Sequence, residues 1–566
     1  PPRSTLFPYT TLFRSTVRLG VALALFALVG AKAADEAGAP PWPKRFQSEP
    51  YRVALYEPQI EAYEGEWMRG RAAVSVARGD DEPVFGALWF GMSLRVARDQ
   101  RLAVVTTFRT DQARFPVEAP ADADLLSRIL GRGMLGAELE FDPLLRSLER
   151  EKAAQEAAVA DPHAVPDILW VPYPAVVVRI DGEPELRDLQ EVDLMRVANA
   201  DAFMVVQKGS GRWYMRLAGE WLTAMGHAGP WNDAADVPAS VLRAAAGVTD
   251  LAAPVQGKPR VIIATGPLEL IETDGEPSYG VIPGTTLLYV TNTDEDVFLD
   301  IADQRHYVLF AGRWFAAPSL SEGPWQAVAP DQLPATFAAI PPSSPKYGVL
   351  VHVPGTQVAA DAVQEAQVPQ IGSVERSRVP DVQVEYSGPP EFVRVESTPV
   401  YYAVNTPYSV LRVDPYYYLC HNGVWYWSAA YHGPWAVSIS VPAVIYTIPP
   451  YYPVYPVTYV RVYDWTPSMV YVGYTSGYLG WHVGWGHGLV FGIGYYDRGW
   501  YRRRVVHHHH YYYTHPACPR PAVYHGYHYG GGWHRPYGGT LSRREMGYGK
   551  RSEEHTSELQ STNTIS

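Results

Sequence analysis

Four aromatic side chains that are close in the chain have the types and spacing of a sugar-stacking surface. They are Tyr418, Trp425, Trp427 and Tyr431, and three of them lie in the stretch GVWYWSAAYHGPW at 423–435. A flat ring can stack on the apolar face of a sugar, but the same rings also fill the interior of a β-hairpin. These residues are therefore our candidates for ligand binding, and the hairpin interior is the competing interpretation.

A run of four histidines offers a different chemistry. His507, His508, His509 and His510 carry imidazoles, which are common ligands of transition metals. A structured metal site also needs ligands at a defined spacing and partners that orient them, and neither is recognisable around this run. The histidines are therefore weak candidates for metal ligands, and the sequence predicts no cofactor.

Motifs of known enzyme classes are absent from the sequence. It contains no Gly-x-Ser-x-Gly turn, no His-Glu-x-x-His, no phosphate-binding loop and no Cys-x-x-Cys pair. Two carboxylates suffice for a glycoside hydrolase, but their separation and a raised pKa decide this, and a sequence shows neither. We therefore predict no catalytic residues and a protein that is not an enzyme, with a glycan hydrolase as a weaker alternative.

The aromatic candidates belong to a pattern that occurs three times in the chain. Each copy has a Gly-x-Pro, then an asparagine at a constant distance (Asn199, Asn292 or Asn405), then a Tyr-x4-Gly-x-Trp, and finally a Gly-Pro-Trp. Agreement at so many offsets indicates an internal repeat, whose copies are longer than the units of ordinary propellers or solenoids. The repeated structural residues are Tyr214, Gly219, Trp221 and Trp231 in the first copy, Tyr307, Gly312, Trp314 and Trp325 in the second, and Tyr418, Gly423, Trp425 and Trp435 in the third.

The Tyr-x4-Gly-x-Trp segment predicts a two-stranded hairpin. In the third copy, Asn422-Gly423 is typical of a type I′ turn, because both residues tolerate positive φ angles. Pairing across this turn places Tyr418 opposite Trp427 on one face. A ring at a repeated position is more often core than ligand contact. Trp427 and Tyr431 are different, because the matching positions in the other copies are not aromatic, so we expect these two to be exposed.

Composition and charge narrow the class of protein. Of the 566 residues, 47% are hydrophobic, which supports a chain with buried cores. The formal net charge of −12 argues against nucleic-acid binding, which needs clustered Lys and Arg. Only two cysteines occur, Cys420 and Cys518, so stability must come from burial, and whether these two pair stays open.

The two ends of the chain are set aside from the fold. Residues 1–15 and 551–566 resemble translated arms of a sequencing adapter, and we expect them to be scars of library preparation. Residues 16–34 contain Arg18, an apolar run and small residues up to Ala33, which is typical of a secretory signal peptide. The apolar run is short for a membrane-spanning helix, and a single N-terminal anchor is the competing interpretation. We therefore expect export to the periplasm, the outer membrane or the cell exterior.

Between these ends the sequence predicts a mainly β protein. Residues 45–165 contain strand-like runs and one helical segment at 121–160, with a break near Pro143. The three repeats are small antiparallel β units at 166–250, 251–354 and 381–470. A Pro- and Gln-containing linker is expected at 355–380. Residues 471–550 are rich in Gly, Tyr, Trp and His, and this composition predicts a low-complexity tail without a core.

Several stretches resemble an uncharacterised group of exported Gram-negative bacterial proteins that are described as carbohydrate-binding family V/XII-like. The stretches are YEPQIEAYEGEWMRGRAAVSV, EPVFGALWFGMSLRV, YVLFAGRWFAAPSLSEGPW, NTPYSVLRV and YTIPP. The resemblance implies the Tyr, Gly and Trp hairpin pattern of small chitin-binding modules and a Gly- and Tyr-rich C-terminal region. It brings no catalytic residues, so none are assigned.

Two classes of function follow from these observations. The first is an exported, non-catalytic envelope protein that binds a polysaccharide or peptidoglycan through exposed aromatic side chains. The alternative is a structural or assembly protein whose hairpins bind other envelope proteins. An exported, aromatic-rich chain built from repeats is compatible with both.

Overall fold

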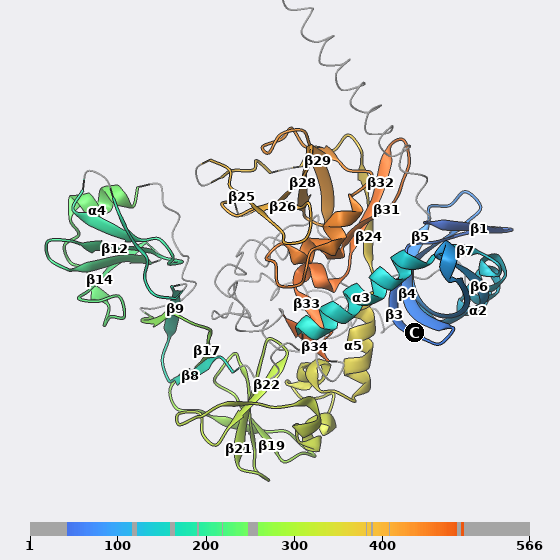
Figure 1. Ribbon diagram of the computed structural model, residues 1–566. Coiled ribbons are helices and arrows are strands. Elements are labelled where there is room, and N and C mark those ends of the chain that lie inside the picture. The colour runs from blue at the N-terminus through green and yellow to red at the C-terminus, as the bar shows by residue number, and fades with distance from the viewer. Residues whose placement is uncertain are drawn as a thin grey trace, which may run out of the picture.

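The computed structural model describes residues 42–491 apart from 116–121, 159–164, 181, 190–191, 218, 247–258, 381, 387–388, 407 and 484–487. Within these residues the protein is mainly β, as the sequence predicts, with an N-terminal unit and three repeats (Figure 1). No helix in this part of the chain is both long enough and apolar enough to span a membrane. The adapter-like ends, the predicted signal peptide, His507 to His510, Cys518 and the predicted tail beyond Phe491 lie outside the described residues.

The N-terminal unit is a seven-stranded antiparallel sheet with two helices. The strand order is β1-β2-β4-β5-β6-β7, and β3 pairs with β4. The strands are β1 (Lys44–Ser48), β2 (Tyr51–Leu55), β3 (Gln59–Glu64), β4 (Trp67–Arg78), β5 (Val84–Ala97), β6 (Leu102–Arg114) and β7 (Glu138–Glu140). The helices are α2 (Ala123–Met134) and α3 (Phe141–Ala158), and the turn η1 (Arg98–Gln100) joins β5 to β6.

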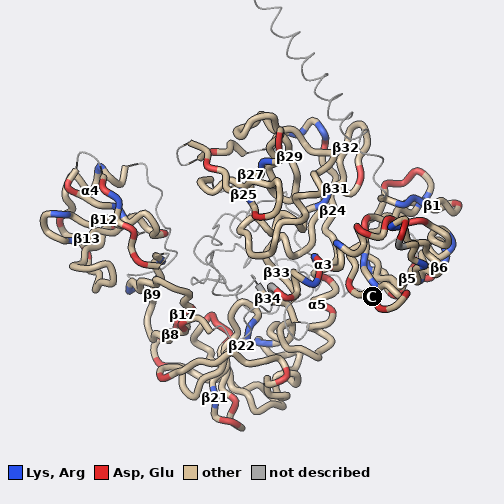
Figure 2. Tube along the Cα trace, viewed as in Figure 1, with Lys and Arg blue, Asp and Glu red and all other residues tan. Residues whose placement is uncertain are grey.

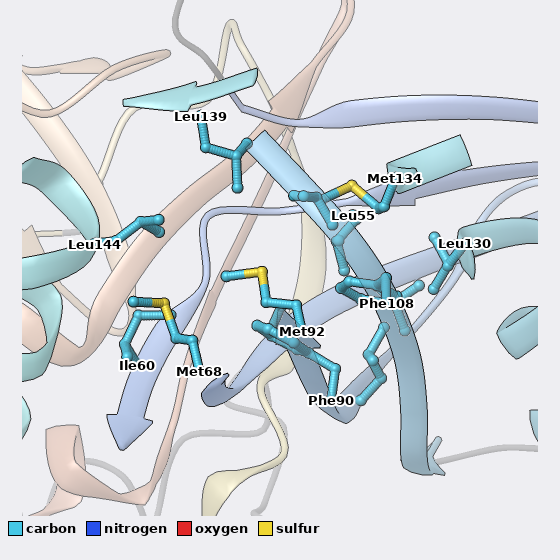
Figure 3. Close-up of a cluster of buried hydrophobic side chains, with 14 of the residues drawn as sticks. Leu55, Ile60, Met68, Phe90, Met92, Phe108, Leu130, Met134, Leu139 and Leu144 are labelled. Carbon is cyan, nitrogen blue, oxygen red and sulfur yellow. The ribbon is translucent and has the colours of Figure 1, made fainter. Parts of the chain in front are cut away.

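One apolar cluster joins this sheet to both helices (Figure 3). Phe90 and Phe108 lie on neighbouring strands with stacked rings whose centroids are 5.0 Å apart. Leu130 of α2 and Leu144 of α3 are buried in the same cluster. Burying a side chain of this size stabilises a fold by about 1.5–3 kcal/mol, so the helices are held chiefly by this core.

The predicted helical segment is two helices in the structure. The Asp122 carboxylate caps α2 by accepting the backbone N–H of Leu125 at 2.7 Å. Gly136 then adopts a φ of 79°, in the left-handed region, and β7 follows before α3 begins. Pro143 lies in the first turn of α3, where backbone N–H groups have no partner within the helix, so the proline costs no helical hydrogen bond. The break therefore precedes the proline.

Each repeat is a six-stranded antiparallel meander, in which strands adjacent in the chain are adjacent in the sheet. Repeat 1 consists of β10 (Leu186–Asp188), β11 (Leu194–Val197), β12 (Phe203–Gln207), β13 (Trp213–Leu217), β14 (Glu220–Ala224) and β15 (Asn232–Asp233). Repeat 2 consists of β18 (Tyr279–Val281), β19 (Leu287–Val290), β20 (Asp296–Asp300), β21 (Arg305–Phe310), β22 (Arg313–Ala317) and β23 (Gln326–Ala327). Repeat 3 consists of β25 (Phe392–Arg394), β26 (Tyr401–Ala403), β27 (Ser409–Val413), β28 (Tyr416–His421), β29 (Val424–Ser428) and β30 (Ala436–Val437). The predicted triplication is confirmed.

The central hairpin has the predicted register and turn. In repeat 3, Tyr418 pairs with Trp427 across the turn. Asn422 and Gly423 have φ angles of 51° and 70°, as a type I′ turn requires. Repeat 2 makes the same turn with Ala311 at a φ of 50°. An alanine is uncommon in this region, so the paired strands impose the turn geometry there.

The repeated asparagine holds the loop before each meander. The Asn292 side chain accepts the backbone N–H of Ser278 and donates to the carbonyl of Glu276, both at 2.8 Å. Asn199 and Asn405 make the same two bonds at the matching positions of their own copies. A carboxylate or an apolar residue cannot supply both a donor and an acceptor here, which accounts for the asparagine in all three copies.

One face of each meander is covered by a helical turn that follows a proline. The turns are α4 (Ala239–Ala244) in repeat 1, η3 (Ala335–Ala339) in repeat 2 and η5 (Ala443–Thr447) in repeat 3, with η2 (Pro330–Gln332), η4 (Tyr347–His352) and η6 (Tyr455–Tyr459) nearby. Each turn buries one apolar side chain on the sheet, namely Val241, Phe337 or Ile445. The hairpin tryptophans lie on this face.

A second β layer covers the opposite face. The strands β8 (Asp167–Val171) and β9 (Ala175–Arg179) precede repeat 1, and β16 (Arg260–Ala264) and β17 (Leu268–Glu272) follow it. They form two parallel pairs, β9 with β16 and β8 with β17. Over repeat 3 the layer is the sheet of β24 (Gln370–Glu375), β31 (Val460–Trp465) and β32 (Met469–Tyr474). The closing residues Trp231, Trp325 and Trp435 pack on this side, opposite to the hairpin tryptophans.

The predicted linker at 355–380 is an ordered part of the fold. It forms α5 (Gln357–Gln367) and β24. The indole N–H of Trp89 donates to the side chain of Gln367 at 3.3 Å, and Arg114 pairs with Asp361 at 3.1 Å. The helix buries only alanines, such as Ala362. The composition of this segment therefore did not reveal an amphipathic helix, which follows repeat 2 and contacts the N-terminal unit.

The start of the predicted tail also belongs to the fold. It contains η7 (Ser476–Leu479), β33 (Trp481–Val483) and β34 (Leu489–Phe491). Tyr478 is buried in the core of repeat 3, and the carbonyl of Leu489 lies 2.7 Å from His352 Nδ1. Glycine-rich composition thus misplaced the boundary, because aromatic side chains in this stretch are used for packing.

Candidate functional site

The hairpin tryptophans are structural residues in repeats 2 and 3. Trp425 is 0% exposed, and its indole N–H donates to the carbonyl of Val460 at 2.9 Å. Trp314 donates in the same way to the carbonyl of His352 at 2.8 Å. A fully buried, hydrogen-bonded ring has no surface to offer a ligand, so Trp425 does not join the candidate site.

Trp427 belongs to a row of side chains that crosses four strands of repeat 3. Cross-strand pairing joins Tyr402 to Leu411, Leu411 to Tyr418, and Tyr418 to Trp427. Residues paired directly across strands share a face. Leu411 is fully buried, whereas Tyr402, Tyr418 and Trp427 are half-buried. These three half-buried rings are called the aromatic row below.

Other rings extend the aromatic row. Tyr416 meets Trp427 edge-on with centroids 5.4 Å apart, and Tyr452 meets Tyr402 edge-on at 5.9 Å. Tyr451 lies beside Tyr452 and is 56% exposed. Burial raises the pKa of Tyr418 to about 12, helped by the neighbouring Tyr416. The Tyr418 hydroxyl therefore stays protonated at neutral pH and can donate a hydrogen bond.

Only the third copy has an aromatic residue at the position of Trp427, the last member of the row. The residues that match Trp427 are Thr223 in repeat 1 and Ala316 in repeat 2. Ala316 is fully buried, and the ring of Phe337 packs edge-on against Tyr307 beside it, at 5.3 Å. In repeat 3 the smaller Ile445 stands in place of Phe337. The sequence pattern identified Trp427 but not the members of the row that other strands contribute. Extending the register of the hairpin to the neighbouring strands would have identified them.

Tyr431 lies on the other side of the sheet from Trp427. Its ring meets Tyr386 edge-on at 5.6 Å, and Tyr386 donates its hydroxyl to the Tyr431 carbonyl at 2.9 Å. The ring of Tyr431 also contacts Tyr417. Side chains alternate along a strand, so Tyr417 lies on the opposite face of the sheet from its neighbour Tyr418. The two strongest sequence candidates therefore do not form one surface.

The described side chains contain no cluster of metal-ligand type. In the ranges given above, no group of three or more His, Cys, Asp or Glu residues could hold a metal ion. Burial raises the pKa of the Cys420 thiol well above its ordinary value, and a hydrogen bond with Tyr478 offsets only part of this. A thiol in this state is neither a nucleophile nor a metal ligand.

Comparisons with family models, with curated proteins and with solved structures found no match to this chain.

Proposed function

We propose that this protein is an exported, non-catalytic protein of the cell envelope that binds a glycan through the aromatic row of repeat 3. The observation that carries the proposal is the placement of Trp427. It occupies a position where the other copies have Thr223 or a buried Ala316, and it is only half-buried. A large ring at such a position adds little to a fold that two other copies build without it.

The chemistry of the aromatic row suits a sugar polymer. A pyranose presents C–H groups on its faces and hydroxyls at its edge, which matches a flat ring bordered by tyrosine hydroxyls. The indole of Trp427 provides the ring, and Tyr418 and Tyr451 provide hydroxyls. Polysaccharide and peptidoglycan are the candidate partners, because the signal-like segment at 16–34 predicts export to the compartment that holds them.

Co-sedimentation tests the proposal. The full chain is mixed with insoluble chitin, cellulose or peptidoglycan, and the fraction that pellets is measured for wild type and for Trp427→Ala. We expect the variant to bind about tenfold more weakly, because a stacked ring contributes up to about 1.5 kcal/mol beyond its buried area. The control is Tyr431→Ala, which removes a ring that is 36% exposed from the opposite face.

Two outcomes would reject the aromatic row as the site. One is sedimentation with none of the three polymers. The other is loss of binding in Tyr431→Ala together with wild-type binding in Trp427→Ala, which would move the site to the cluster around Tyr386 and Tyr417.

A second candidate function is assembly with other envelope proteins. The first strand of each meander is an edge strand, and each carries exposed apolar side chains: Leu186 on β10, Tyr279 and Val281 on β18, and Val393 on β25. An open, apolar strand edge is a template for pairing with another chain. Crosslinking in the native envelope would recover protein partners that Val281→Lys reduces, whereas recovery of glycan alone would contradict this candidate.

A further inference from the structure

A cavity of about 900 Å³ lies between the N-terminal unit and repeat 3. Its walls come from β1, β3, β4, β5, β7 and α3 on one side, and from η5 and β31 on the other. Cavities that bind small organic ligands have volumes of about 300–1,000 Å³. The volume is therefore sufficient for a short oligosaccharide and far larger than a single ion needs.

Contacts between the two units hold the cavity in shape. Tyr56 packs edge-on against Tyr463 at 5.5 Å in an apolar cluster shared by both units. Arg45 forms an ion pair with Asp464 at 2.8 Å, and Arg461 forms one with Glu57 at 3.3 Å. The cavity is thus a preformed feature between residues distant in the chain.

Not every arginine of the cavity lining forms an ion pair with a carboxylate. Like Arg45 and Arg461, Arg71 is paired: it binds Glu61 and Glu151, and their combined effect holds its pKa above the usual range in spite of burial. Arg146 and Arg150 are the two arginines of the lining that have no such ion pair with a described residue. They lie one helical turn apart on the face of α3 that borders the cavity, among the mixed charges that Figure 2 shows along this helix.

Arg150 lacks a counter-ion of its own. No hydrogen bond or ion pair joins its guanidinium to a carboxylate anywhere in the described part of the chain, and the nearby Glu57 already accepts from Arg461. Burial lowers the pKa of Arg150, the positive charges of Arg461 and Arg146 add to this, and the carboxylate of Glu57 offsets only part of it. Two like charges one turn apart also repel each other. A bound anion would relieve all three costs.

The cavity lining also contains aromatic rings. Trp42, Tyr446 and Trp465 line the same cavity, and Trp465 is 50% exposed. The guanidinium of Arg461 lies over the ring of Tyr446 at 3.9 Å. A cavity lined both by flat rings and by the guanidinium groups of Arg146 and Arg150 matches a ligand that carries both sugar rings and carboxylates.

We propose that this cavity binds an acidic oligosaccharide, with a carboxylate against Arg146 and Arg150 and sugar rings against Trp42 and Trp465. The proposal rests on the glycan-binding function above and names the class of glycan. A chain with a net charge of −12 repels polyanions over much of its surface. An acidic sugar therefore needs a local basic site, and this cavity supplies one. Trp427 does not line it, so it is separate from the aromatic row.

Calorimetric titration of the full chain tests the proposal. The probes are trigalacturonate, an alginate trisaccharide and a hyaluronan tetrasaccharide, together with the methyl ester of trigalacturonate. We expect binding to at least one acidic probe, and at least tenfold weaker binding when its carboxylates are esterified. Arg150→Gln and Arg146→Gln should each weaken the acidic ligand by a similar factor, because each removes a charge-assisted hydrogen bond. The matched control is Arg128→Gln, an exposed arginine on α2 that does not line the cavity.

Four results would overturn the inference. They are failure of all three acidic probes, equal binding of the methyl ester, wild-type affinity in both cavity variants, and displacement of the sugar by inorganic phosphate at equal concentration. The Trp427→Ala variant keeps the two proposals apart. If it loses sedimentation with insoluble glycan while no acidic probe binds, only this inference fails; if acidic probes bind but wild type does not sediment, only the aromatic row fails.

Discussion

Repeat 2 and repeat 3 are the same six-stranded meander with different outer surfaces. Both bury the hairpin tryptophan and bind its indole N–H to a backbone carbonyl later in the chain, that of His352 in repeat 2 and that of Val460 in repeat 3. They differ two residues further on, where repeat 2 has the buried Ala316 and repeat 3 has the half-buried Trp427. The comparison teaches that positions shared by the copies build the sheet, whereas positions that differ determine what the sheet presents at its surface.

The largest expected effect tests the shared part of the comparison. Trp314→Ala and Trp425→Ala should each destabilise their own repeat by about 3–5 kcal/mol, because each empties a fully packed site. Trp221→Ala should cost less, since Trp221 is only half-buried. Hydrogen exchange in peptides from each repeat measures the local loss. Equal losses in all three copies would contradict a ranking by burial.

The next effect comes from exchanging the residue that differs. Ala316→Trp should destabilise repeat 2 by about 3 kcal/mol, because Phe337 and its neighbours leave no room for an indole. The reverse change, Trp427→Ala, should cost only about 1–2 kcal/mol because the ring is half-buried. Thermal unfolding with local hydrogen exchange compares the two. A well-tolerated Ala316→Trp would mean that repeat 2 has an equivalent open surface.

A smaller effect is expected at the shared asparagine. Asn292→Ala and Asn405→Ala each remove a donor and an acceptor from the loop before the meander, and each should cost about 1–2 kcal/mol. Asn→Asp at the same sites keeps the acceptor and should cost less. Chemical denaturation followed by tryptophan fluorescence measures these changes. An Asp variant as unstable as the Ala variant would show that the donor matters most.

The smallest expected effect is a pH dependence of the folding stability, and it comes from Glu272 at the junction of repeats 1 and 2. Burial raises the pKa of Glu272, partly offset by the hydrogen bond from the Ala175 N–H, and Asp294 raises it further. A raised folded-state pKa means that the group favours folding at acidic pH, and that this contribution is lost as the pH rises through that value. Glu272→Gln keeps an acceptor for Ala175 without the charge.

The melting temperature of Glu272→Gln should therefore exceed that of wild type at pH 7.5, and the difference should disappear near pH 4. The control is Glu276→Gln in an exposed loop of the same repeat, which should leave the melting temperature unchanged at both pH values. An advantage of Glu272→Gln that persists at pH 4 would show that the carboxylate charge is not the cause.

Much of the fold could be predicted from residues close together in the chain. The Asn422-Gly423 turn, the pairing of Tyr418 with Trp427 and the three-fold pattern all follow from turn chemistry and strand alternation. Composition was a poorer guide. Composition predicted a linker at 355–380 and a tail from 471. Both predictions were wrong in part, because the composition of a segment does not reveal that its small or aromatic side chains have a packing partner elsewhere in the chain.

The candidate site was predicted only in part, for the same reason. Trp427 was identified because it differs between copies, but Tyr402 and Tyr452 join it through strands and turns that the hairpin does not contain. Tyr431 was grouped with Trp427 by proximity in sequence, yet the turn after β29 takes it to the other side of the sheet.

The amino-acid order alone determined the local units of this protein, since hairpins and helix caps depend on neighbouring residues and on the allowed backbone angles. Only the tertiary structure decided which rings are covered and where charges meet. Exposure depends on segments that fold back from elsewhere, as Ile445 and Phe337 do over their sheets. The cavity between the N-terminal unit and repeat 3 is the extreme case, because its lining residues Glu57 and Arg461 form an ion pair although they are 404 positions apart.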